Sequence, residues 1–139
     1  MKSGEINSLF KNLSKVIKNP KSDLKYKNKF TLLVSVVLSA QCTDVNVNNV
    51  TKNIYPKYNK PEHFVKLGRK KIEKLIKSIG LFRNKAKSVY LLSKQLIEKH
   101  NGKVPKNFDD LYALPGVGKK TASVVLNEGF GLPTIAVDT

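Results

Sequence analysis

Two adjacent lysines follow a glycine-rich turn in the stretch LPGVGKKTASVVL, residues 114–126. Glycine permits a positive φ and lets a neighbouring backbone or a ligand approach closely. Such a turn at the start of a helix presents free N–H groups, and these groups and the helix dipole both favour a bound phosphate. A tight helix–helix turn without a ligand is the alternative interpretation. The residues expected to contact phosphate, without reading base sequence, are Gly116, Val117, Gly118 and Lys119, with the Val117 side chain expected to turn inward and fix the hairpin.

Lys120, the second lysine of this pair, lies in the first turn of the helix predicted over residues 119–127. The positive end of the helix and the ammonium of Lys119 both disfavour a protonated amine at this position. A neutral amine is the nucleophilic form of lysine, so covalent chemistry is one interpretation of this residue. The alternative is a solvated lysine in a lysine-rich chain.

Asp138 lies in the segment PTIAVDT, where an acidic residue follows an apolar run in a chain that is poor in acid. From the residues alone it predicts a cap for a following helix, a position at which aspartate is favoured.

The charge of the chain points to a polyanionic partner. The 139 residues contain 26 Lys+Arg and 10 Asp+Glu, for a formal net charge of +16. Such an excess is typical of proteins that bind nucleic acid. Only Arg69 and Arg83 are arginines, and asparagine and isoleucine are plentiful, so an AT-rich genome explains part of the magnitude but not the sign. The length predicts one domain, or one domain with an arm.

Other residue classes limit the function further. Cys42 is the single cysteine, which excludes an internal disulfide and a multi-cysteine metal site within these residues. His63 and His100 show no pattern typical of a metal site or a catalytic triad, and we expect them to be structural or surface residues. No stretch is long and apolar enough to span a membrane, and the N-terminus lacks the apolar core of a signal peptide. We therefore expect a soluble intracellular protein.

Apolar residues recur at helical spacing along the whole chain, and no alternating pattern predicts a strand. The sequence therefore predicts an all-α fold. Residues 30–41 are apolar almost all round, as in a central helix. Thr43 is the expected cap of the next helix, with Asp44 in its first turn. The other expected helices lie at residues 6–17, 61–67, 70–79, 86–97, 108–114 and 119–127. Gly80 is expected to end the helix at 70–79, Asn101-Gly102 to close the one at 86–97, and Asn107 to cap the one at 108–114.

Five segments together resemble the endonuclease III family of helix-hairpin-helix DNA glycosylases. They are LLVSVVLSAQCTDVNVN, KSIGLFRNKAKSV, HNGKVP, LPGVGKKTASVVL and PTIAVDT, and their order and spacing agree with the family. The resemblance implies a six-helix barrel domain at residues 21–132, with the helix-hairpin-helix at 108–127. It also implies that residues 1–20 form a helix that packs with a C-terminal iron–sulfur domain, which begins at 133–139.

The resemblance assigns the chemistry as well. Lys120 matches the family's Schiff-base lysine, and Asp138 matches its catalytic aspartate. The implied reaction removes an oxidised pyrimidine by attack of the lysine on C1′, and it then cleaves the strand 3′ to the abasic site by β-elimination. A carboxylate near the sugar would stabilise the positive charge that develops there. The related adenine-excising glycosylases lack this lysine, so Lys120 favours the bifunctional branch.

Two further residues are implied to enter the DNA. Gln41 matches the residue that fills the gap left by the flipped base, and Leu81 matches an apolar wedge inserted into the base stack. The alternatives are a buried glutamine at a helix end and simple core packing, respectively. Asp44 is expected to order the turn around Gln41, and Cys42, where the family commonly has a small residue, is expected to pack.

The chain also departs from the family. The family carries a [4Fe–4S] cluster on four C-terminal cysteines, and none of these occurs in the 139 residues. We therefore expect no cofactor on the residues present, and weak or no activity from this chain because Asp138 lacks a following helix. The expected partner is double-stranded DNA with a damaged base or an abasic site, bound by a monomer in the bacterial cytoplasm near the nucleoid. A non-catalytic DNA-binding module and a degraded gene product are the alternatives.

Overall fold

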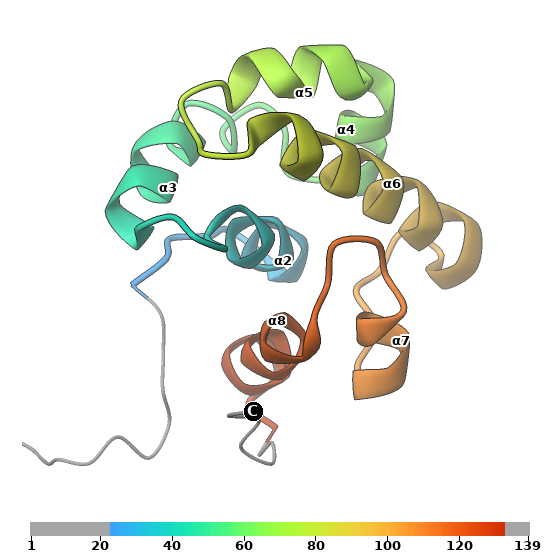
Figure 1. Cartoon of the computed structure of the whole chain (residues 1–139). Helices are drawn as coiled ribbons and strands as arrows, with labels where there is room; N and C mark the ends of the chain where they lie inside the picture. The colour runs from blue at the N-terminus through green and yellow to red at the C-terminus, as the bar shows by residue number, and fades with distance from the viewer. Residues whose placement is uncertain (1–22, 133–139) are drawn as a thin grey trace, which may run out of the picture.

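The computed structural model describes residues 23–132 and shows an all-helical chain, without a strand in that range (Figure 1). The all-α prediction is thereby confirmed. The helix expected at residues 6–17 and the segment with Asp138 lie outside the described residues. In chain order the elements are α2 (Lys29–Leu38), α3 (Asp44–Thr51), α4 (Pro61–Leu67), α5 (Arg69–Leu75), α6 (Phe82–His100), α7 (Phe108–Tyr112), α8 (Lys119–Val124) and the π-helical segment η1 (Val125–Gly129).

Helix α2 is the centre of the fold. Figure 1 shows it between α6 on one side and α8 on the other, and every residue from Phe30 to Leu38 is buried. Asn28 begins the helix with a capping box, since its side chain accepts from the Thr31 N–H and the Thr31 hydroxyl accepts from the Asn28 N–H. The helix ends at Leu38, three residues before the predicted end at Gln41.

Helix α6 joins the layers of the fold. It packs against α4 and α5 on one side and contacts α2 on the other. Its apolar face is buried, as the helical spacing predicted. Asn101 and Gly102 end the helix with φ values of 55° and 77°, which confirms the predicted stop at this pair.

The short helices are capped largely as the sequence indicated. The Thr43 hydroxyl accepts from the Asn46 N–H at the start of α3, and α4 has the predicted bounds. Helix α5 ends at Leu75 rather than near Gly80, so that part of the prediction is wrong. The apolar pattern extended the predicted helix too far, because Ile76 and Ile79 are buried although they lie beyond the end of α5.

Helices α7 and α8 and the turn between them form the helix-hairpin-helix. The Asn107 side chain accepts from the Asp110 N–H and caps α7 as predicted. The helix predicted over 119–127 is α-helical only to Val124 and continues as a π-helix to Gly129. A Cβ on Gly129 would lie 2.9 Å from the Leu32 side chain, so this segment packs closely on α2.

Candidate nucleic-acid interface and catalytic cleft

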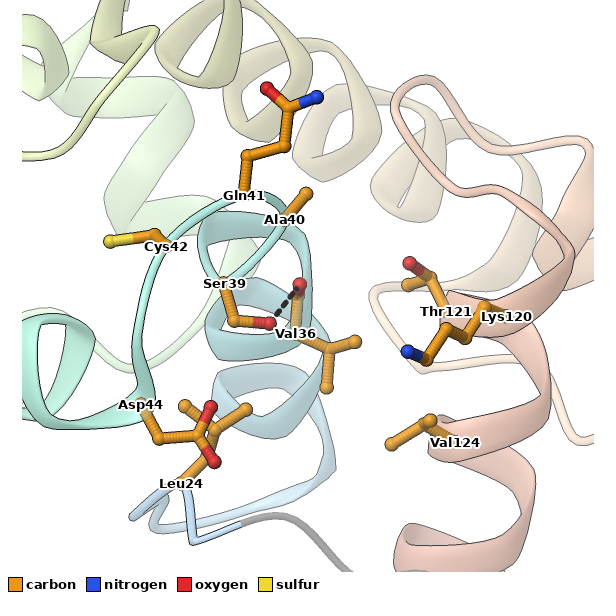
Figure 2. A pocket seen from close by; sticks show the side chains of 10 residues that line it. All are labelled: Leu24, Val36, Ser39, Ala40, Gln41, Cys42, Asp44, Lys120, Thr121 and Val124. Atoms are coloured by element: carbon orange, nitrogen blue, oxygen red, sulfur yellow. Dashed lines mark hydrogen bonds between the residues drawn. The ribbon is translucent and has the colours of Figure 1, made fainter.

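A cleft of about 600 Å³ opens between the end of α2 and the start of α8 (Figure 2). It is lined by Leu24, Val36, Ser39, Ala40, Gln41, Cys42, Asp44, Lys120, Thr121 and Val124. The predicted site residues Gln41 and Lys120 come from segments far apart in the sequence, and the fold brings both to this cleft. Figure 2 shows the Lys120 side chain extending from α8 toward α2.

Lys120 occupies the second position of α8. The N-cap residue Gly118 has no side chain that could cap α8. The first helical hydrogen bond of α8 runs from the Ala122 N–H to the Gly118 carbonyl, at 2.9 Å. The N–H groups of the preceding residues therefore point out of the helix start, where its dipole is positive. Both lysines are exposed, but among the described residues the cleft lining includes Lys120 and not Lys119.

The hairpin that precedes these lysines is fixed by a buried side chain and a backbone hydrogen bond. Val117 is buried and its N–H donates to the Leu114 carbonyl at 3.1 Å, so the side chain points inward as the sequence predicted. Gly116 has a φ of 78°, and a Cβ built on it would lie 2.5 Å from the Cβ of Ser88. A Cβ built on Gly118 would meet no other atom within 4 Å. Direct contacts of these residues with DNA stay predictions.

Gln41 and Leu81 are both exposed, and both have a φ of 59°. The buried glutamine and the core-packed leucine, which were the alternative interpretations, are therefore wrong. Leu81 is 57% exposed and lies at the N-cap of α6. A left-handed backbone costs a residue other than glycine about 1–2 kcal/mol. Exposed, strained residues of this kind cluster at functional sites.

Lys85 is a residue that the sequence interpretation missed. It is 6% exposed, and its Nζ donates to the carbonyls of Leu38 at 2.9 Å and Ala40 at 2.5 Å. Burial lowers the pKa of its amine, and the charge of nearby Cys42 opposes the shift. Its burial could have been inferred from the sequence, because Lys85 lies on the apolar face of α6, three residues after Phe82 and next to Ala86.

The remaining residues singled out from the sequence have structural contacts. An Asp44 carboxylate oxygen accepts from the Asp23 N–H at 2.9 Å. Asp44 therefore ties the segment that precedes α2 to the start of α3. The thiol of Cys42 accepts from the Asn46 side-chain amide at 3.2 Å while also lining the cleft. His63 accepts from the Asn59 N–H through Nδ1, in agreement with the structural role expected for it.

The residues present do not fit an iron–sulfur cluster. A [4Fe–4S] cluster is held by four cysteine thiolates, and Cys42 is the only cysteine in the sequence. Residues 23–132 also contain no group of three or more His, Cys, Asp or Glu side chains placed to hold a metal ion. Over the same range, no helix has both the length and the apolar character needed to cross a membrane.

Comparisons with known proteins agree with this geometry. Over all 139 residues the chain is 52% identical to endonuclease III of Rickettsia conorii, of which it spans 66%, and over 117 residues it is 52% identical to endonuclease III of Bacillus subtilis, of which it spans 53%. The chain therefore covers about half to two thirds of the length of these relatives.

Solved structures give the same result. A trapped covalent intermediate of endonuclease III with DNA, an estranged-adenine complex, has a TM-score of 0.80 at 52% identity, covering 84% of this chain and 55% of that chain. A thermostable thymine-DNA glycosylase has a TM-score of 0.71 at 31% identity, covering 75% and 48%. Residues 34–139 match the HhH-GPD superfamily. The chain belongs to the HhH-GPD superfamily of base excision DNA repair proteins, and within it resembles endonuclease III along its whole length.

Proposed function

We propose that the chain carries the catalytic machinery of a bifunctional DNA glycosylase and AP lyase of the endonuclease III type, with the weak activity that its sequence leads us to expect. The observation that carries the proposal is the extension of Lys120 from the helix-hairpin-helix into the cleft that Gln41 also lines. A hairpin that only bound DNA would need neither the cleft nor a lysine directed into it. The related structure of a covalent endonuclease III–DNA intermediate supports covalent chemistry in this fold.

Binding begins at the phosphates. The hairpin turn and the first N–H groups of α8 receive a phosphate, with Lys119 beside them. Every lysine in the described residues except Lys85 is exposed, so the surface as a whole attracts the duplex. Because this attraction releases counterions, the affinity for undamaged duplex should fall steeply as salt is raised.

Recognition of damage then exposes the sugar. The damaged nucleotide rotates out of the stack, because C1′ cannot be reached within it. Gln41 fills the gap that the flipped base leaves, and Leu81 enters the stack as a wedge. The exposed position of both side chains supports these roles.

The covalent steps follow at Lys120. Its neutral amine attacks C1′, the N-glycosidic bond breaks, and the base leaves with the bonding electrons and takes up a proton. The sugar ring opens to give a Schiff base between Nζ and C1′. Loss of a proton from C2′ then expels the 3′ phosphate by β-elimination. We assign to Asp138, which lies outside the described residues, the stabilisation of the sugar's positive charge and help in deprotonating the amine.

We extend the proposal to substrate and setting from the same resemblance. The substrate class is oxidised pyrimidines in double-stranded DNA, bound by a monomer in the bacterial cytoplasm at the nucleoid. Residues 21–132 would form the six-helix domain, with residues 1–20 and 133–139 belonging to the part that carries the cluster in the family.

Strand cleavage tests the proposal. Two labelled duplexes, one with an oxidised pyrimidine and one with an abasic site, are incubated with the native chain, Lys120→Ala and Lys119→Ala. We expect a slowly formed β-elimination product from the native chain and from Lys119→Ala, and none from Lys120→Ala. Salt-sensitive binding without any cleavage product by the native chain would instead favour the non-catalytic DNA-binding module.

A further inference from the structure

One lysine differs from all others in the part of the chain that the structure describes. Lys85 is buried, whereas every other described lysine is exposed. A buried ammonium is costly unless hydrogen bonds compensate it, so its contacts are informative. No step of the proposed reaction uses this residue.

The contacts of Lys85 link two turns. Its Nζ donates to the carbonyl of Leu38, at the end of α2, and to that of Ala40, directly before Gln41. Its backbone N–H donates to the carbonyl of Leu81 at 3.0 Å. Lys85 is therefore bonded both to the turn that carries Gln41 and to the turn that carries Leu81, the two exposed residues proposed to enter the DNA.

We propose that Lys85 is a positioning residue that holds the Gln41 turn and the Leu81 turn at a fixed separation, so that both side chains enter the duplex at the flipped nucleotide together. This inference rests on the DNA-inserting roles proposed above for those two residues. It assigns Lys85 no contact with DNA.

Physical chemistry supports a positioning role. The carbonyls at the end of a helix carry partial negative charge and lack helical partners, so an ammonium is well suited to them. Bonds from a charged donor are stronger than neutral ones and fix the geometry more tightly. The left-handed conformation of Gln41 is unfavourable by itself and persists only where surrounding contacts determine it. Two bonds to the residues preceding Gln41 provide such contacts.

The test measures insertion rather than overall affinity. A duplex carries 2-aminopurine opposite a tetrahydrofuran abasic analogue, and its fluorescence rises when the estranged base is unstacked. Lys85→Met matches the side chain as far as Cε and removes the ammonium and its donors, and Lys87→Met on the exposed side of α6 is the matched control. For Lys85→Met we expect the fluorescence rise to be lost and the preference for abasic over undamaged duplex to fall by about tenfold. Salt-dependent affinity for undamaged duplex should match that of Lys87→Met.

Two further variants separate this inference from the proposed function. Gln41→Ala and Leu81→Ala should each reduce the fluorescence rise, as the proposed roles require. If they do so and Lys85→Met retains native discrimination, the positioning role is wrong. If neither has an effect, the DNA-inserting roles fail and the inference fails with them.

A measurement on the native chain covers the case in which Lys85→Met does not fold, as judged by circular dichroism. Most lysine ammonium groups exchange protons too fast to give an NMR signal near neutral pH, whereas a buried, bonded ammonium exchanges slowly. We expect a slowly exchanging Lys85 Nζ signal in the free protein and in its complex with the abasic duplex. Loss of that signal on binding would show that Lys85 releases the Gln41 turn, which contradicts the proposal.

Discussion

Gln41 and Leu81 have the same left-handed backbone conformation, with a φ of 59° at each, although neither is glycine and they come from separate turns. Both side chains are exposed, so core packing does not explain the strain. Each turn is bonded to Lys85, which places the two strained residues in one connected arrangement.

Relief of this strain should stabilise the protein at the expense of function. Asparagine tolerates the left-handed conformation better than leucine does, and Leu81 is 57% exposed and so loses little burial on replacement. We expect Leu81→Asn to raise the free energy of unfolding by up to about 1 kcal/mol. The urea midpoint measures this gain, and the same protein should prefer abasic duplex less than the native chain does. A clear loss of stability would show that the leucine side chain packs more than its exposure indicates.

The two glycines of the hairpin should respond differently to an added methyl group. In Gly116→Ala the new Cβ has to avoid Ser88 and the backbone has to hold a φ of 78°. We expect a loss of about 1–3 kcal/mol in unfolding free energy. The matched control is Gly118→Ala, where φ is −94° and the space is open, and the change should stay within about 0.5 kcal/mol. Equal losses in the two variants would contradict this account of the turn.

Lys85 should make the free energy of unfolding of the native chain depend on pH in the alkaline range. Burial lowers the pKa of this amine in the folded state, so between that lowered value and the ordinary 10.5 the unfolded chain binds more protons. Stability contributed by this group therefore rises with pH across that window, by at most about 1.4 kcal/mol per pH unit, and is constant below it. A neutral amine keeps two N–H donors for the two carbonyls.

Urea unfolding of the native chain and of Lys85→Met over this pH range measures the effect. Both proteins carry Cys42→Ala, which removes the nearby thiol as a second titrating group. The difference in unfolding free energy, native minus variant, should increase with pH. A difference that decreases would mean that the two hydrogen bonds outweigh desolvation and raise the pKa.

Much of the fold could be predicted because local signals agreed with the tertiary structure. The caps at Thr43 and Asn107 follow from side chains that bond to their own backbone. The stop at Asn101 follows from its left-handed backbone next to Gly102, and the start of α4 from Pro61 at its first position. Two helix ends could not be predicted in this way. Burial continues past the end of α5, and α8 changes to a π-helix where Gly129 packs on Leu32, a contact between segments far apart in the sequence.

The site was predictable in part for a similar reason. Lys120 and the hairpin are contiguous, so the sequence shows them together. Lys85 was missed because an amphipathic pattern does not distinguish a lysine that bends to the surface from one whose ammonium reaches the carbonyl of Leu38 at the end of α2 and that of Ala40 in the turn after it. The exposure of Leu81 likewise depends on its backbone conformation, which the apolar side chain does not indicate.

Borohydride trapping on a duplex with one abasic site tests the central claim most directly. Reduction fixes the Schiff base as a covalent protein–DNA adduct, and each adduct records a single attack, so slow turnover does not hide the chemistry. We predict an adduct with the native chain and with Lys119→Ala, and none with Lys120→Ala. An adduct that persists in Lys120→Ala, or no adduct from a native chain that binds the duplex, would contradict the assignment of Lys120 as the nucleophile held in this cleft.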